Sequence, residues 1–87
     1  MTVVQRRYFV ETPGPDGSDH RVLTRVTFTE KELYGELWNV VDRAWYYVRS
    51  ADQVLLDQSY VREITEEEAL RIADEKVAEY RAEKKRR

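Results

Sequence analysis

Alternating hydrophobic and polar residues predict two strands in the first third of the chain. Residues 3–11 are rich in β-branched and aromatic side chains, which favour strands. Residues 22–28 alternate with a period of two, which is typical of a strand with one buried face. The residues on one side are Val22, Thr24, Val26 and Phe28. Between these strands, residues 12–20 contain two prolines and two glycines and are predicted to form a loop. We therefore expect an antiparallel hairpin with a long connection.

The segment 30–49 is compatible with two structures. The apolar residues of ELYGELWNVVDRAWYYVR follow a wide helical stripe, and Thr29 with Glu32 has the spacing of a capping box. Gly35, however, disfavours a helix interior by about 1 kcal/mol, and the β-branched and aromatic residues disfavour it further. The alternative is a hairpin with strands at 32–38 and 44–49 around a turn at 39–43, which would let aromatic residues pair across strands.

The next residues are ambiguous in the same way. Ser50 with Gln53 has the spacing of a capping box, which favours a short helix over residues 54–56. The same stretch is also compatible with strands at 53–56 and 59–64.

The last segment has the clearest pattern of the chain, that of an amphipathic helix. Thr65 with Glu68 forms a capping box, and Ile64 stands where a hydrophobic staple begins. The predicted core-facing stripe consists of Leu70, Ala73, Val77 and Tyr80. Acidic residues 66–68 and basic residues 84–87 complement the helix dipole, and we expect 84–87 to be a basic tail that frays.

These elements predict a single α+β domain over residues 1–87. In it, an N-terminal antiparallel β-hairpin or short meander packs against the C-terminal amphipathic helix, which covers the apolar face.

Composition narrows the class of protein. The chain has 87 residues, 41% of them hydrophobic and 37% charged, with a net charge of −2, which is typical of a small folded domain. It contains no cysteine, which excludes disulfides, thiolate catalysis and zinc-finger chemistry. No apolar run approaches the roughly 20 residues that a membrane span needs, and the N-terminus lacks the apolar core of a secretory signal. We expect a soluble, cytoplasmic protein without a membrane partner.

Aromatic residues are concentrated in the middle of the chain. Some of them are expected to fill the core, because a small domain needs large side chains to bury. Both structures considered for 30–49 leave other aromatics outside the buried stripe, and exposed tyrosine and tryptophan are enriched at binding hot spots. We therefore predict a protein-binding surface consisting of Tyr34, Trp38, Trp45, Tyr46 and Tyr47.

Basic residues near both ends suggest a second kind of surface. The C-terminal run would make weak, salt-sensitive contacts with phosphates, and the N-terminal arginines would extend it if the first strand lay alongside. The alternative prediction is a nucleic-acid-binding surface consisting of Arg6, Arg7, Arg81, Lys84, Lys85, Arg86 and Arg87. A solvated helix end that complements the dipole is the favoured explanation of the terminal charges.

Motifs for catalysis or metal binding are weak throughout. His20, the single histidine, lies near Asp16 and Asp19 in the loop, with no second histidine and no cysteine to complete a metal site. The sequence contains no phosphate-binding loop, dinucleotide fingerprint or nucleophile elbow. We predict a non-enzymatic interaction module without cofactor or metal, which binds another protein or a second copy of itself.

Overall fold

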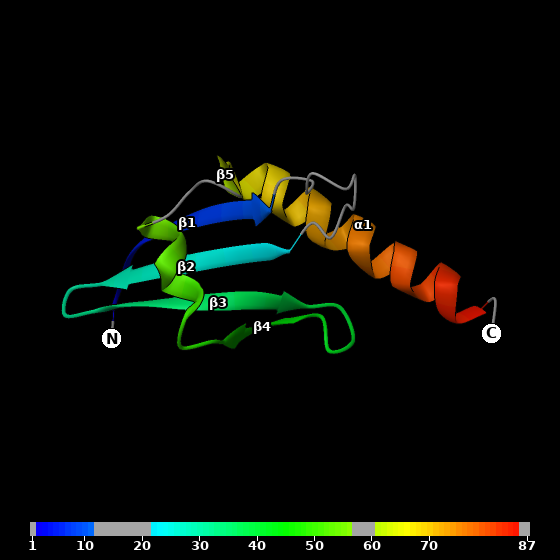
Figure 1. Cartoon of the computed structure of the whole chain (residues 1–87), viewed down its shortest axis with the longest axis horizontal. Helices are drawn as coiled ribbons and strands as arrows, with labels where there is room; N and C mark the ends of the chain where they lie inside the picture. Colours follow the sequence, from blue (N-terminus) through cyan, green and yellow to red (C-terminus); the bar gives the residue numbers. More distant parts are fainter. Residues whose placement is uncertain (1, 12–21, 57–60, 86–87) are drawn as a thin grey trace.

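The chain folds into a five-stranded antiparallel sheet with one long helix packed on one of its faces (Figure 1). The computed structural model describes residues 2–11, 22–56 and 61–85. The first four strands cross the sheet as a meander and the fifth returns beside the first, in the order β4-β3-β2-β1-β5. The elements are β1 (Val3–Glu11), β2 (Leu23–Thr29), β3 (Leu33–Asn39), β4 (Ala44–Tyr47), the 3₁₀ helix η1 (Ala51–Leu55), β5 (Val61–Ile64) and α1 (Glu66–Lys85). The predicted single α+β domain is confirmed.

The pairing register assigns each strand residue to one of two faces. Tyr8 lies opposite Arg25, and Arg25 lies opposite Glu36, so these three side chains share a face. Because α1 packs on this side, we call it the helix face. Val26 and Gly35 lie opposite each other on the second face, which η1 covers and which we call the η1 face.

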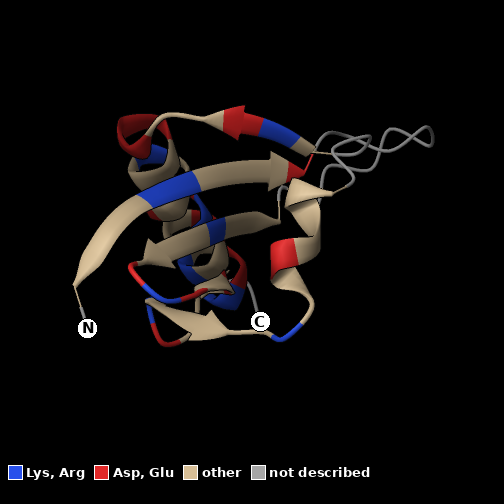
Figure 2. Cartoon of the chain, turned by 90° about the vertical axis from the view of Figure 1, so that its left-hand side faces the viewer, with Lys and Arg blue, Asp and Glu red and all other residues tan. Residues whose placement is uncertain are grey.

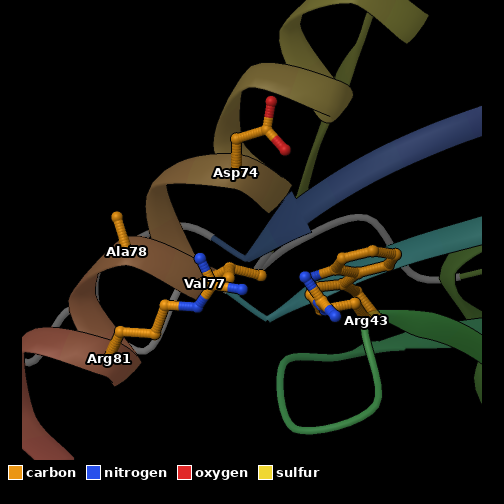
Figure 3. A pocket seen from close by; sticks show the side chains of 6 residues that line it. Arg43, Asp74, Val77, Ala78 and Arg81 are labelled. Atoms are coloured by element: carbon orange, nitrogen blue, oxygen red, sulfur yellow. The ribbon is translucent and has the colours of Figure 1, made fainter.

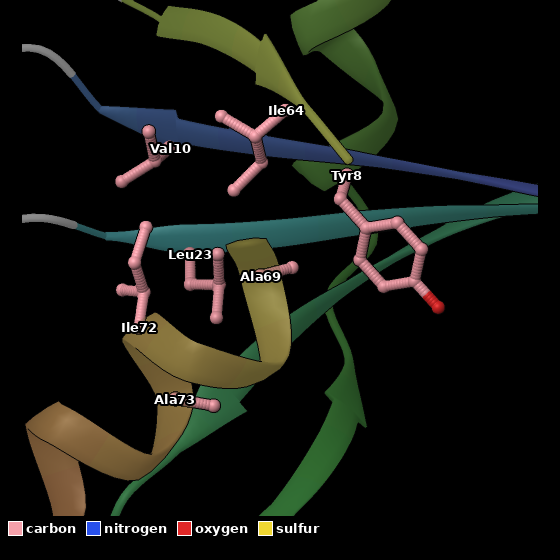
Figure 4. Packing of buried hydrophobic residues seen from close by; sticks show 7 residues of the cluster. All are labelled: Tyr8, Val10, Leu23, Ile64, Ala69, Ile72 and Ala73. Carbon is pink, nitrogen blue, oxygen red and sulfur yellow. The ribbon is translucent and has the colours of Figure 1, made fainter. Parts of the chain in front are cut away.

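The main core lies between α1 and the helix face of β1, β2 and β5 (Figure 4). Alanines on the helix bring its backbone close to the sheet, and larger aliphatic side chains fill the space between them. The cluster consists of Tyr8, Val10, Leu23, Ile64, Ala69, Ile72 and Ala73.

The predicted start of α1 is confirmed, whereas its predicted core stripe is only partly correct. The Glu68 backbone N–H donates to Thr65 Oγ1 at 3.2 Å, as the capping box requires. Leu70, however, is 50% exposed, and the residues that face the sheet are Ala69, Ile72 and Ala73. Only Thr65 separates the helix from buried Ile64 at the end of β5, and Ile64 and Ala69 belong to the same core cluster.

The central strand β2 is buried on both faces, although its alternating pattern predicts one. Leu23 faces α1 and is 1% exposed, while Val26 faces η1 and is fully buried. Thr27, on the helix face, is also fully buried. Because β2 has a strand on either side and cover on both faces, the positions that the pattern assigns to solvent are buried as well.

The segment 30–49 forms the hairpin of β3 and β4, so the helical alternative is wrong. The capping-box pair Thr29 and Glu32 nevertheless makes its hydrogen bond. The Glu32 N–H donates to Thr29 Oγ1 at 3.1 Å, and the Thr29 N–H donates to the Glu32 carbonyl at 2.8 Å, which closes the turn between β2 and β3. The threonine side chain thus satisfies the same kind of donor in a turn as it would at a helix start.

The turn between β3 and β4 is closed by a side chain and by a left-handed residue. Asn39 Oδ1 accepts hydrogen bonds from the backbone N–H groups of Val41 at 2.9 Å and Asp42 at 3.0 Å. Arg43 then has φ of 53°, in the left-handed region that glycine and asparagine usually occupy.

Gly35 allows η1 to rest directly on the sheet. A Cβ atom at this position would lie 2.4 Å from the backbone nitrogen of Asp52 and 2.6 Å from Ala51 Cβ. The short helix predicted after Ser50 is present, although it covers residues 51–55 instead of 54–56. The Ser50 side chain makes no capping bond, and its carbonyl accepts from the Gln53 N–H at 3.1 Å instead.

A network of polar side chains joins β1, β2 and β3 on the helix face, and its β1 member is Arg6, whose Nε–H donates to Thr27 Oγ1 at 3.4 Å. Arg25 donates two hydrogen bonds to the Glu36 carboxylate, at 3.0 and 2.9 Å, and the Thr27 hydroxyl donates to the same carboxylate at 2.9 Å. The Arg25 guanidinium also lies 4.6 Å from the centre of the Trp45 ring. Burial raises the pKa of Glu36, but the hydrogen bonds from Arg25 and Thr27 and the nearby positive charges outweigh it, so the pKa lies below its ordinary value.

The contact at Gly35 predicts that Gly35→Ala destabilises the protein. The atoms that the new Cβ meets belong to the backbone of η1 and to Ala51, so η1 must shift away from the sheet. We expect a loss of about 1–3 kcal/mol in the free energy of unfolding, measured by urea denaturation. Ala78→Gly at an exposed helix position is the control, where propensity alone costs about 1 kcal/mol. An unfolding midpoint for Gly35→Ala equal to that of the wild type would contradict this packing.

The difference in burial between two similar ion pairs gives a second prediction. Arg25 with Glu36 is mostly buried, with side chains 14% and 12% exposed, whereas Arg7 with Glu63 is 32% and 43% exposed. At pH 7 we expect Glu36→Gln to cost about 2 kcal/mol and Glu63→Gln less than about 1 kcal/mol.

The pH dependence of the Glu36 effect follows from its lowered pKa. Its contribution is fully present above the ordinary glutamate pKa of about 4.3 and is lost as the pH falls through the lower, folded-state pKa. The stability difference between wild type and Glu36→Gln should therefore shrink in urea titrations at progressively lower pH. A constant difference down to pH 2 would contradict the assignment.

Candidate functional site

The hairpin of β3 and β4 carries all five aromatics of the predicted protein-binding surface. Trp38 lies opposite Trp45 and Glu36 lies opposite Tyr47, which places both tryptophans and Tyr47 on the helix face. Tyr34 lies opposite Thr27 and shares that face. Tyr46 pairs with Leu37 and points to the η1 face. The structure therefore groups four of these residues and separates the fifth.

Trp38 and Trp45 extend the core and form no exposed platform. Both pack against the main hydrophobic cluster, and their ring centres lie 5.3 Å apart in an edge-to-face arrangement. Trp45 also contacts Tyr8, with ring centres 6.0 Å apart. Through these edge-to-face contacts, the rings connect the core beneath α1 with the edge strand β4.

The tyrosines of the hairpin are the aromatics that face solvent. Tyr47 is 66% exposed and Tyr46 is 45% exposed, while half-buried Tyr34 meets Tyr47 with ring centres 6.4 Å apart. The Tyr46 hydroxyl donates a hydrogen bond to Asp42 Oδ2, and this bond raises the pKa of Tyr46 above its ordinary value. Tyr46 is thus tied to the turn, and Tyr47 is the most exposed aromatic of the hairpin.

The outer edge of β4 presents backbone hydrogen-bonding groups. The Val48 N–H donates to the Gly35 carbonyl at 3.1 Å, which fixes the alternation of inward and outward groups along the strand. Ala44 and Tyr46 direct their backbone groups toward β3, and Trp45 and Tyr47 direct theirs outward. No other strand among the described residues pairs with this edge.

A groove separates the β3–β4 turn from the second half of α1 (Figure 3). Its volume is about 330 Å³. Arg43 stands on the turn side and Arg81 on the helix side, and their guanidinium groups extend toward one another across the space between. The lining consists of Trp38, Arg43, Asp74, Val77, Ala78 and Arg81.

The basic residues predicted to bind nucleic acid are not brought together. Arg6 and Arg7 lie on β1 with side chains on opposite faces, and Arg7 donates two hydrogen bonds to Glu63, at 2.9 and 2.6 Å. The start of β1 and the end of α1 lie at opposite ends of the molecule (Figure 1). Lys84 and Lys85 belong to the last turn of α1. Acidic and basic positions are interspersed over the ribbon (Figure 2), and residues 86–87 lie outside the described part.

The described residues contain neither a cluster of metal ligands nor a helix that could span a membrane. His20, with Asp16 and Asp19, lies outside the described ranges. Within residues 2–11, 22–56 and 61–85, no three histidine, cysteine or acidic side chains come together to hold a metal ion. In the same part of the chain, no helix combines the length and the apolar character that crossing a bilayer requires.

The chain was compared with models of protein families, with curated proteins and with solved structures, and none of them matched. A function for this protein is therefore inferred from the geometry of the hairpin and the groove.

Two features of these sites were missed by the sequence reasoning. The role of Arg43 depends on a turn that exists only if residues 30–49 form a hairpin. The open edge of β4 depends on strand order, which neither composition nor periodicity specifies.

The packing of the aromatics predicts that truncation destabilises the protein much more at Trp45 than at Tyr47. We expect Trp45→Ala to lower the free energy of unfolding by about 2 kcal/mol or more, because it removes contacts with Tyr8, Trp38 and Arg25. Tyr47→Ala, two residues away on the same face, should cost less than about 1 kcal/mol. Urea denaturation followed by circular dichroism measures both. Equal losses would mean that Tyr47 is a core residue.

Proposed function

We propose that the protein is a non-enzymatic binding module that accepts an extended segment of another protein beside β4. The open edge of β4 carries this proposal. Its outward backbone groups at Trp45 and Tyr47 match those that an added strand needs, and such groups supply the affinity when a peptide extends a sheet.

The side chains around the edge supply contacts for an added strand. Tyr47, with Tyr34 behind it, lies on the helix face, and Tyr46 lies on the η1 face. An added strand places alternate side chains on the two faces, where they meet these tyrosines as cross-strand neighbours. Because Tyr46 is held by Asp42, less freedom is lost when a partner packs on its ring.

Charges next to the strand favour a different protein over a second copy. Two copies joined edge to edge about a two-fold axis at Tyr46 would bring Arg43 of each, just before β4, toward Arg49 of the other, just after it. Like charges directly opposite one another are destabilising. An extended segment with acidic residues at these positions gains from the same two arginines.

The test measures the contribution of the outward backbone groups to peptide affinity separately from the contribution of the side chains. Peptides that bind the protein are selected from a displayed library, and their affinities for variants are measured by calorimetry. Tyr47→Ala removes the ring and keeps the outward N–H, so we expect affinity to fall about tenfold. Tyr47→Pro removes the N–H as well, while the bonds to β3 remain, so we expect binding to be lost.

Lys31→Ala, in the β2–β3 turn, is the matched surface control and should bind as the wild type does. Circular dichroism verifies that each variant keeps the fold. Equal affinity of Tyr47→Pro and Tyr47→Ala would exclude strand addition, and a library without any binding peptide would contradict the proposal as a whole.

A further inference from the structure

We infer that the groove between the β3–β4 turn and α1 is an oxyanion-binding site, in which Arg43 and Arg81 hold a carboxylate or phosphate group between them. This site shares Arg43 with the flank of the β4 edge, but its other lining residues lie on β3 and α1, and it does not depend on the binding of an extended segment.

Two guanidinium groups from distant parts of the chain face the groove from opposite sides. Arg43 comes from the turn before β4 and Arg81 from the last third of α1 (Figure 3). Neither of them makes a hydrogen bond or an ion pair with another residue of the described part of the chain. Planar guanidinium groups match carboxylate and phosphate oxygens two at a time, so a bound oxyanion would relieve the repulsion between them.

The acidic side chains near these arginines are directed elsewhere. Asp74 lines the groove, but its carboxylate makes no ion pair with Arg43 or Arg81 and points to the side away from Arg81 (Figure 3). Asp42, the chain neighbour of Arg43, accepts the hydrogen bond of the Tyr46 hydroxyl. Lys84 and Lys85 follow Arg81 within about one helical turn and add to the positive potential at this end of the groove.

The backbone at Arg43 also supports a role for its side chain. Its φ of 53° is one that glycine adopts without strain and that an arginine adopts at a cost in free energy. The turn itself is closed by the Asn39 side chain, which does not require arginine at this position. A strained residue whose side chain reaches into a groove is a reason to look for a ligand there.

One residue of the lining carries a further donor, which is buried. Trp38 lines the groove, and its indole Nε1–H is buried without a hydrogen-bond partner in the described structure. A buried donor without an acceptor is unfavourable, and a small shift of the indole toward a bound oxyanion would give it one. The volume of about 330 Å³ suits one small anionic group with its immediate substituents.

The test uses the full chain and two probes, inorganic phosphate and the tricarboxylate citrate, each titrated at constant ionic strength set with sodium chloride. Binding is followed by NMR through the indole N–H signal of Trp38 and the Nε–H signals of the arginines. We expect saturable shifts centred on Trp38, Arg43 and Arg81. Saturation by citrate alone points to acidic polypeptide as the source of the oxyanion, and saturation by phosphate alone points to a phosphorylated molecule.

Three variants make the result specific. Arg43→Gly and Arg81→Gln should each weaken binding at least about tenfold, because each removes charge-assisted hydrogen bonds. Arg43→Gly should at the same time raise the melting temperature, since glycine relieves the left-handed backbone. Arg71→Gln removes a cation from α1 outside the groove and should leave binding unchanged.

Several outcomes would overturn the site. These are shifts that do not saturate with either probe, shifts that survive in Arg43→Gly and Arg81→Gln, and an equal loss in Arg71→Gln. Tyr47→Pro should retain anion binding, so failure of strand addition at β4 and failure of the oxyanion site are distinguishable.

Discussion

The contact between Gly35 and the backbone of η1 determines how the second face of the sheet is closed. With no side chain at residue 35, a single turn of 3₁₀ helix reaches the sheet and covers Val26 on the central strand. Even a Cβ atom there would lie 2.4 Å from the Asp52 backbone nitrogen, so η1 would have to move away from the sheet. Among the described residues no second long helix lies on the sheet, so η1 is the helical element that covers this face.

Because α1 and η1 cover the central strand β2, the outer hairpin of β3 and β4 is less covered. α1 packs on β1, β2 and β5, and its buried residues end at Ala73, in the first half of the helix. The hairpin of β3 and β4 is held by the backbone pairing of β3 with β2, by the Arg25–Glu36 pair and by the edge-to-face tryptophans, which pack against the edge of the main core. Its outer edge and its turn are therefore left accessible, and the second half of α1 stands apart from the turn with the groove between them.

The elements that the sequence predicts correctly are those whose patterns depend only on residues close together in the chain. β1, β2 and the start of α1 follow from alternation and from the Thr65 capping box, and these suffice for the fold class. Residues 30–49 could not be assigned because their apolar spacing fits both a helix and a hairpin. The decision comes from contacts with other elements, such as Gly35 against Asp52 and Glu36 against Arg25. The face of α1 that packs on the sheet was also predicted only in part, because it depends on contacts with other elements, such as the core cluster that Ala69 shares with Ile64 of β5.

The candidate sites were less predictable than the fold, because exposure depends on register. Five aromatics of the hairpin look equivalent in the sequence, yet pairing buries the indoles against the core and exposes Tyr46 and Tyr47 on opposite faces. Arg43 connects the two sites. It lies in the β3–β4 turn, flanks the open edge of β4 and faces Arg81 across the groove. In the two sites that we propose, a positively charged residue at this point would discourage pairing with a second copy and favour anionic groups, so one side chain in a strained turn would bias the hairpin toward acidic partners.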